Sequence, residues 1–160
     1  MLEATSAEEV RRTLHAYCRL LDARDFDGLV ARVYSEDAID DRKRGRPLRG
    51  RAEIAEYFRR ASTHLQATAH LLTNVEVDVD TDAGTATASS RVIACHWSIA
   101  PDDQPAARPA DFVLLGSYDD VLRLTSDGWQ ITHRVVGALG PAGLLAGSLP
   151  AVFAGFGGAS

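Results

Sequence analysis

The chain has 160 residues, the size of one ordinary domain, and its 46% hydrophobic and 24% charged residues are typical of folded globular proteins. Its formal net charge of -5 at pH 7 argues against a nucleic-acid partner, because phosphate binding needs clustered basic side chains. No stretch approaches the roughly 20 apolar residues that span a bilayer. The segment Met1–Glu9 lacks the apolar core of a secretory signal, so we expect a cytoplasmic protein.

Three helices are predicted in the first part of the chain. Ser6 and Glu9 have the spacing of a capping box, which predicts a first helix from about Ser6 to Ala23. Its apolar residues recur at helical spacing: Val10, Leu14, Tyr17 and Leu21. Asp25 is a suitable N-cap for a short second helix, with Phe26, Leu29, Val30 and Val33 as its apolar residues. Residues 52–61 show the spacing of a third helix.

A basic stretch separates the second helix from the third. Residues 37–41 are predicted to form a short strand before it, and its basic residues are Arg42, Lys43, Arg44, Arg46, Arg49 and Arg51. We interpret this stretch as a solvated loop rather than an anion site, because glycine and proline interrupt it.

The second part of the chain is predicted to consist of strands. Val75, Val77 and Val79 alternate with polar residues, which predicts a half-buried strand that begins directly after His70. Four further features follow along the chain: a turn at 80–84, a strand at 85–99, a polar loop at 101–109, and two strands at 112–124 and 129–138 joined by a turn.

Helices followed by antiparallel strands indicate the α+β class. We predict a cone-shaped fold, in which a curved antiparallel sheet and the three N-terminal helices enclose a pocket. This domain spans residues 1–138. The tail, residues 139–160, is rich in glycine and alanine but carries large apolar side chains. We therefore interpret the tail as a lid over the pocket or a dimer contact rather than a frayed end.

Metal, redox and phosphate motifs are absent from the sequence. Cys18 and Cys95 are the only cysteines, without the spacing of a disulfide framework or metal site, and we interpret both as buried apolar residues. The five histidines form no His-x-x-x-His pair, and no glycine-rich phosphate loop occurs. We expect no metal and no cofactor.

Asp22 and His70 are the candidates for acid–base chemistry. Asp22 ends the first helix, where burial and the negative end of the helix dipole would both raise its pKa. A surface acid paired with Arg19 or Arg24 is the alternative, and spacing alone does not choose between them. His70 has small or apolar neighbours, and is either a general base or a histidine of the core.

Other residues are candidates for the lining of the pocket. His96 and His133 alternate with apolar residues on their strands, so that each either lines the same cavity or is structural. The predicted substrate-binding residues are His96, Trp97, Tyr57, Phe58, Phe112 and His133.

The order of several segments resembles SnoaL-like proteins of the nuclear transport factor 2-like superfamily. The segments lie between about residues 6 and 138: 17–29, 34–38, 50–58, 70–75 and 128–131. In the dehydratase branch, which includes scytalone dehydratase and bile-acid 7α-dehydratase, a helix-end Asp and a His form a catalytic pair. The matching positions are Asp22 and His70, and Tyr17 matches a tyrosine that serves as acid or oxyanion donor.

The resemblance implies a cofactor-independent lyase. His70 would abstract a proton while Asp22 orients the ring, in a dehydratase-type elimination on a hydrophobic cyclic or polyketide-like molecule. Two alternatives stay open, an isomerase or aldol-type cyclase with the same pair and a non-catalytic small-molecule-binding module. Asp40 and Asp41 do not align with the acid of ketosteroid isomerase, and His96 only approximates the second histidine of scytalone dehydratase. A homodimer or homotrimer built through sheet faces is also implied.

Overall fold

The computed structural model describes residues 2–43, 45–100, 105, 107–140 and 143–148. The helices are α1 (Leu2–Asp22), α2 (Phe26–Val33), α3 (Gly50–Ala61) and the 3-10 turn η1 (Ser62–His64). The strands are β1 (Tyr34–Asp41), β2 (Leu48–Arg49), β3 (Leu65–Asp80), β4 (Thr85–Ser98), β5 (Phe112–Thr125), β6 (Gly128–Ala138) and β7 (Leu144–Gly147).

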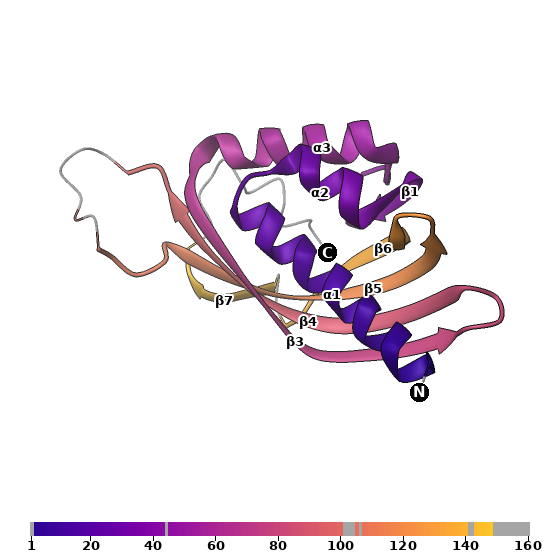
Figure 1. Cartoon of the computed structure of the whole chain (residues 1–160). Helices are drawn as coiled ribbons and strands as arrows, with labels where there is room; N and C mark the ends of the chain where they lie inside the picture. Colours follow the sequence, from indigo (N-terminus) through magenta and orange to yellow (C-terminus); the bar gives the residue numbers. More distant parts are fainter. Residues whose placement is uncertain (1, 44, 101–104, 106, 141–142, 149–160) are drawn as a thin grey trace.

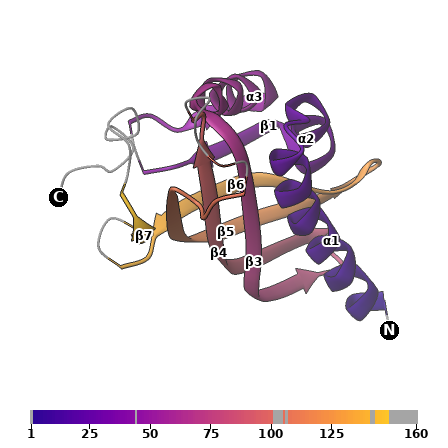
Figure 2. The same ribbon diagram turned by 90° about the vertical axis from the view of Figure 1, so that its left-hand side faces the viewer.

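A curved, unclosed sheet forms one layer, and the three helices cover one of its faces (Figures 1 and 2). The strand order is β2-β1-β6-β5-β4-β3, and β7 pairs with β5. These features confirm the predicted α+β class. The predicted all-antiparallel sheet is wrong in one place, because β1 and β6 pair in parallel. A parallel pair needs a long connection, which α3 and the intervening strands supply.

The ends of the first two helices differ in how well they were predicted. Helix α1 starts at Leu2 rather than Ser6, because no proline or glycine interrupts the preceding residues, so Ser6 lies inside the helix. The predicted N-cap of the second helix is confirmed, since the Asp25 side chain accepts a hydrogen bond from the Gly28 nitrogen at 2.9 Å. A Cβ at Gly28 would lie 2.2 Å from an Asp25 carboxylate oxygen. The hydrogen bond between Asp25 and the backbone of residue 28 therefore favours glycine at this position.

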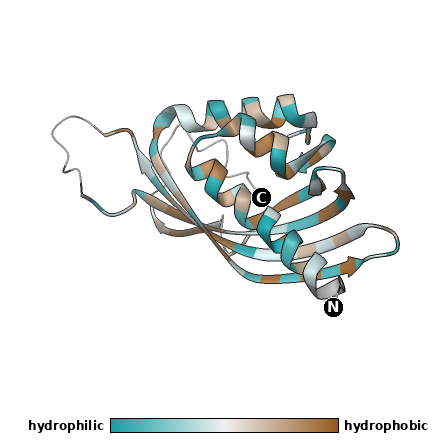
Figure 3. Ribbon diagram, viewed as in Figure 1, coloured by the Kyte–Doolittle hydropathy of each residue, from teal (hydrophilic) through white to brown (hydrophobic). Residues whose placement is uncertain are grey.

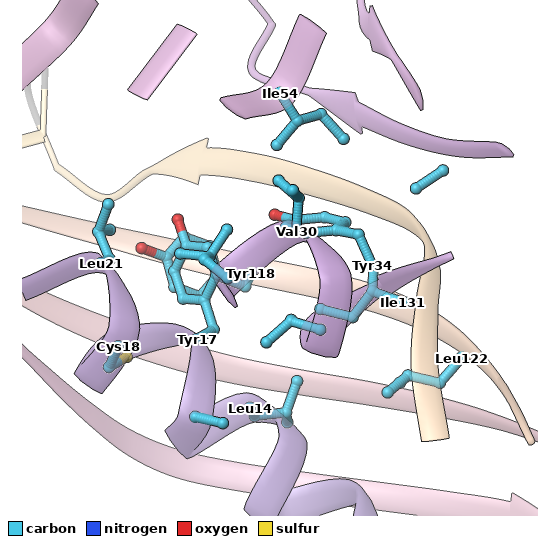
Figure 4. Packing of buried hydrophobic residues seen from close by; sticks show 14 of the residues in the cluster. Leu14, Tyr17, Cys18, Leu21, Val30, Tyr34, Ile54, Tyr118, Leu122 and Ile131 are labelled. Atoms are coloured by element: carbon cyan, nitrogen blue, oxygen red, sulfur yellow. The ribbon is translucent and has the colours of Figure 1, made fainter. Parts of the chain in front are cut away.

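The main core lies between the helices and the concave face of the sheet. In Figure 3, hydrophobic residues alternate with hydrophilic ones along the strands beneath α1. Figure 4 shows α1 side chains packing toward residues of the sheet, among them Tyr17 beside Tyr118. The fully buried members of this core include Val10, Leu14, Leu29, Val33, Ile54, Leu122 and Ile131.

A β-bulge in β3 determines which way His70 faces. His70 lies within β3 and pairs with Ala94, so the prediction that the strand begins after His70 is wrong. In a regular strand, His70 and Val75 would face opposite sides, because they are five residues apart. The register shifts between Thr73 and Glu76, where Asn74 has a φ of 49°. The shift lets residues of both halves of β3 face the core, as Leu72 and Val75 show.

A second bulge changes which face of the sheet the side chains of β6 lie on. Val121 pairs with His133 while Leu122 pairs with Ile131, so one extra residue lies between the two partners on β6. Arg134 therefore shares the buried face with Ile131, and His133 is exposed. The unbroken alternation that placed His133 beside Ile131 is wrong for this reason.

The tail contains a strand, β7, that the sequence pattern did not predict. Strand β7 pairs with the start of β5, with Phe112 opposite Gly147. Residues 141–142 and 149–160 lie outside the described residues, and so does most of the tail predicted to act as a lid or dimer contact. Among the residues that the structure describes, no helix has the length and apolar character of a membrane span.

The bulge makes Asn74 sensitive to substitution. We expect Asn74→Val to lower the free energy of unfolding by roughly 1–3 kcal/mol, because a β-branched residue is strained at positive φ. Asn74→Gly should be tolerated better, since glycine adopts this conformation freely. Urea unfolding of both variants measures the difference, and equal stabilities would contradict a strained bulge at this position.

Candidate active site

Asp22 and His70 meet where α1 ends against β3. The Nδ1 atom of His70 lies 2.6 Å from one carboxylate oxygen of Asp22. The same carboxylate accepts hydrogen bonds from the backbone nitrogen of His70 and from the hydroxyl of Thr68, both at 2.8 Å. The His70 side chain is 9% exposed and that of Asp22 is 26% exposed. The two groups predicted to act together are therefore in direct contact.

The prediction that the pKa of Asp22 is raised is wrong, because the pKa is lowered. Burial raises the pKa of Asp22, as expected, but the hydrogen bonds from the His70 ring, the His70 backbone and Thr68 together outweigh burial and lower it. Three donors stabilise the charged form more than desolvation penalises it. The carboxylate is therefore ionised at neutral pH.

The ionised carboxylate determines how His70 holds its proton. A carboxylate can only accept hydrogen bonds, so Nδ1 of His70 must carry the hydrogen in the short contact. Whenever the ring is neutral, its Nε2 atom keeps its lone pair. This arrangement leaves a base on the side of the ring away from Asp22.

A second histidine lies next to the dyad. The rings of His96 and His70 are 5.9 Å apart and nearly perpendicular, and His96 stacks on Phe112 with 4.5 Å between ring centroids. Burial, with a smaller contribution from His70, lowers the pKa of His96 to about 4. His96 is therefore neutral at pH 7. The structure brings the predicted residues His96 and Phe112 to the dyad.

Tyr17 lies in a separate buried group. Its ring makes edge contacts with Tyr34, Phe58 and Tyr118, at centroid distances of 5.6 to 6.3 Å. Its hydroxyl accepts a hydrogen bond from Arg42 at 3.4 Å. The contacts of Tyr17 are thus with this group, whereas those of His70 are with Asp22 and His96.

Two largely buried ion pairs lie around Tyr17, and no local sequence pattern predicts either of them. Arg134 donates two hydrogen bonds to Asp120, at 2.7 and 2.8 Å, and both residues are almost fully buried. Asp40 pairs with Arg42, with 3.0 Å between Oδ1 and Nε. The prediction of a solvated loop is wrong for Arg42, whose side chain is only 17% exposed.

The remaining predicted lining residues fall in different places. Tyr57 and Phe58 join the Tyr17 group, where the guanidinium of Arg42 lies 4.5 and 4.8 Å from their ring centroids. Trp97 follows His96 on β4 and so faces the other side of the sheet, where its indole donates to the Arg108 carbonyl at 3.0 Å. The structure does not bring Trp97 to the dyad.

Two surface hollows lie away from the dyad. One, of about 470 Å³, is lined by Ser35, Glu36, Asp37, Arg51, Arg123, Thr125, Asp127 and Gln130. The other, of about 330 Å³, is lined by residues that include Glu76, Asp78, Asp119 and His133. His133 thus contributes to a hollow without the dyad residues. Within the described part of the chain, no group of three or more His, Cys, Asp or Glu side chains has an arrangement that could hold a metal ion.

Comparisons with known proteins identify relatives of this chain. The model of the SnoaL-like domain matches residues 2–135. An uncharacterized protein of Mycobacterium tuberculosis is 34% identical over 134 residues, which cover 83% of this chain and 85% of that protein.

Two solved structures from Novosphingobium aromaticivorans share the fold. One, named "Putative Scytalone Dehydratase", has a TM-score of 0.68 and 21% identity and covers 81% of this chain and 80% of its own. The other, an NTF2-like protein with a cystatin-like fold, has a TM-score of 0.68 and 23% identity and covers 96% of this chain and 89% of its own. The predicted cone-shaped fold is confirmed by this likeness to a cystatin-like fold.

Burial of His96 makes stability depend on pH. The unfolded imidazole binds a proton below pH 6.5, whereas the folded one does so only below about 4. The unfolded state therefore holds more protons between these values, and the free energy of unfolding should fall as the pH is lowered from 7 to 4. We expect His96 to contribute up to roughly 3 kcal/mol of this fall, measured by urea unfolding at several pH values.

Two variants isolate the contribution of His96. His96→Phe should keep the stack on Phe112 and flatten the pH dependence, because phenylalanine does not titrate. The matched control, His133→Phe, alters an exposed histidine and should keep the wild-type slope. If His96→Phe also keeps that slope, His96 is not the group responsible.

Proposed function

The chain belongs to the SnoaL-like domain family, and from that premise we propose that it is a cofactor-independent lyase of the dehydratase type. It acts on a hydrophobic cyclic or polyketide-like small molecule by acid–base chemistry. The observation that carries this proposal is the 2.6 Å contact between His70 and an Asp22 carboxylate held by two further donors. A cytoplasmic location remains part of the prediction.

His70 supplies the base of the proposed reaction. Its Nε2 lone pair removes a proton from a carbon next to a carbonyl, and the ring becomes an imidazolium. Asp22 stabilises this cation through the short contact to Nδ1. Because three hydrogen bonds hold the carboxylate already, little reorganisation is needed when the charge forms.

The same histidine completes the elimination. The electron pair of the broken C–H bond forms the new carbon–carbon double bond as the C–O bond of the leaving hydroxyl breaks. The imidazolium returns its proton to that hydroxyl, so that one water molecule leaves and His70 is neutral again. In this proposal His96, which is neutral and lies 5.9 Å from His70 between ring centroids, accepts or donates a hydrogen bond near the leaving group.

The name of one structural neighbour favours the proposal of elimination. The name of the Novosphingobium structure, "Putative Scytalone Dehydratase", agrees with it. An isomerase or aldol-type cyclase would use the same base, but its products would not include released water. A non-catalytic binding module would bind ring compounds without product formation.

Substitutions of the dyad test the mechanism. We expect His70→Ala and Asp22→Asn each to lower kcat/KM by a factor on the order of 10² or more, because general acid–base catalysis contributes about that much. Hydrophobic ring compounds with a hydroxyl β to a carbonyl would first be screened by thermal stabilisation. Mass spectrometry then follows the loss of one water molecule from each compound that binds.

The matched control is His15→Ala, which removes an exposed histidine from α1. It should leave turnover unchanged, while circular dichroism checks the fold of all variants. Wild-type turnover in both dyad variants would refute the mechanism. A product of unchanged mass would indicate the isomerase instead.

We also propose that the outer face of the sheet joins copies of this chain as a homodimer or homotrimer. Leu71, Ile93 and Leu115 lie side by side across β3, β4 and β5, and Leu71 is 52% exposed. An apolar row of this kind is costly to leave in water. Its burial between copies would remove that cost.

Sedimentation tests this association. The wild type should sediment as a dimer or trimer, and Leu71→Asp should weaken association at least tenfold because a charge would be buried. Glu76→Gln, on the acidic part of the same face, is the control. A wild type that remains monomeric at all concentrations would exclude the interface.

A further inference from the structure

The last residue of β4 is bonded on one side by side chains rather than by a strand. The backbone nitrogen of Ser98 donates a hydrogen bond to a carboxylate oxygen of Asp111 at 2.7 Å, and its carbonyl accepts one from the guanidinium of Arg108 at 2.6 Å. In an antiparallel sheet, both backbone groups of a residue point toward the same neighbouring strand. Because β5 begins only at Phe112, Arg108 and Asp111 take the place of a strand partner for Ser98.

The same two side chains also bind each other. Arg108 and Asp111 form an ion pair, and the Arg108 side chain is only 12% exposed. The hydrogen bonds from Arg108 and from the Ser98 backbone nitrogen lower the pKa of Asp111, so its carboxylate is ionised at neutral pH. From the outer face of the sheet, the indole of Trp97 holds the Arg108 carbonyl. Ser98, Arg108 and Asp111 are together called the strand-end clasp.

The strand-end clasp joins β4 to β5 beside the ring of His96. The backbone nitrogen of Asp111 donates a hydrogen bond to the carbonyl of His96 at 2.9 Å. The next residue, Phe112, is 1% exposed and stacks on the His96 ring. Phe112 and Leu65 form a small buried cluster that is distinct from the main core. The position of Phe112 on the ring therefore depends on the contacts that hold these two strand ends together.

The charge of His96 affects whether His70 can take up a proton. Burial is the largest cause that lowers the pKa of His96 to about 4, His70 adds to it, and Asp22 opposes it. The other nearby charges, on Arg108 and Asp111, are paired in the strand-end clasp. Two imidazolium rings 5.9 Å apart would repel each other. A buried, uncharged His96 thus leaves His70 free to become protonated.

We propose that Arg108 and Asp111 are positioning residues that keep the ring of His96 buried against Phe112 and beside His70. By fixing the end of β4 to the start of β5, the strand-end clasp holds Phe112 on the ring and excludes water from it. The catalytic consequence of this inference rests on the proposed function, in which His70 is the base. The positioning itself is a property of contacts within the protein.

NMR of the histidine rings tests the positioning without a substrate. The His96 signal is identified by its loss in His96→Phe, and its titration midpoint should be about 4 in the wild type. Asp111→Ala removes an acceptor from both Ser98 and Arg108. Its midpoint should move toward 6.5, a gain in proton affinity of about tenfold or more, because water reaches the ring. An unchanged midpoint in folded Asp111→Ala would overturn the proposal.

A matched control separates positioning from a general loss of stability. Asp37→Ala breaks an exposed ion pair with Arg123, near the other end of β5, and should leave the His96 midpoint at the wild-type value. Urea unfolding of both alanine variants measures their stability. If Asp111→Ala lowers the free energy of unfolding but leaves the midpoint unchanged, the strand-end clasp is merely structural and the proposal is wrong.

Two milder variants keep the test decisive if Asp111→Ala does not fold. Asp111→Asn retains an oxygen that accepts the hydrogen bond from Ser98 but loses the charge that pairs with Arg108. Its His96 midpoint should lie between those of the wild type and Asp111→Ala. Arg108→Met keeps an apolar chain but removes the guanidinium, and should also raise the midpoint. Wild-type midpoints in both folded variants would contradict the proposal.

Activity distinguishes a failure of this inference from a failure of the proposed function. On a ring compound that the wild type dehydrates, the kcat of Asp111→Ala relative to that of the wild type should fall as the pH is lowered through 6.5, because His96 becomes charged beside His70. A constant ratio would exclude the catalytic consequence. If the wild type dehydrates no ring compound while the midpoint rises in Asp111→Ala, the proposed function fails and the positioning stands.

Discussion

The hydrogen bonds that the Asp22 carboxylate accepts from β3 join the end of α1 to the sheet. One carboxylate binds the ring of His70, its backbone nitrogen and the hydroxyl of Thr68. These bonds fix the helix relative to the strand, set the His70 ring and keep Asp22 ionised. Structure and proposed chemistry therefore depend on the same three contacts.

The interior of the cone is polar on one side, and this is tolerated because its charges compensate one another. Asp40, Arg134 and Asp120 lie in a row across β1, β6 and β5, and Arg42 completes a second ion pair. Isolated buried charges would be very costly, but paired and hydrogen-bonded ones can be accommodated. The result is a set of fixed dipoles and charges around Tyr17, while the dyad and His96 occupy a separate part of the same concave face.

Helical periodicity predicted the helices well. The alternation of apolar and polar residues in strands predicted which face of the sheet a side chain lies on only where the strand is regular. The capping residue Asp25 and the turn between β5 and β6 are local signals, because they depend on neighbouring residues. Alternation failed at the bulge of β6, since one extra residue reverses every side chain beyond it. His133 was assigned to the wrong face for this reason, and Arg134 was overlooked. The buried role of Arg42 also had no local signal, because its partners Asp40 and Tyr17 come together only in the fold.

The sequence by itself determined the α+β class, the order of the helices and hairpins, and the identity of Asp22 and His70 as candidates. Only the tertiary structure decided that these two groups touch, that the sheet is mixed, and that Arg42 and Arg134 lie inside it. The physical reason is that periodicity and capping act over a few residues of one segment. Contacts across α1, β3 and β6 depend on register, and a bulge changes register without changing the local pattern.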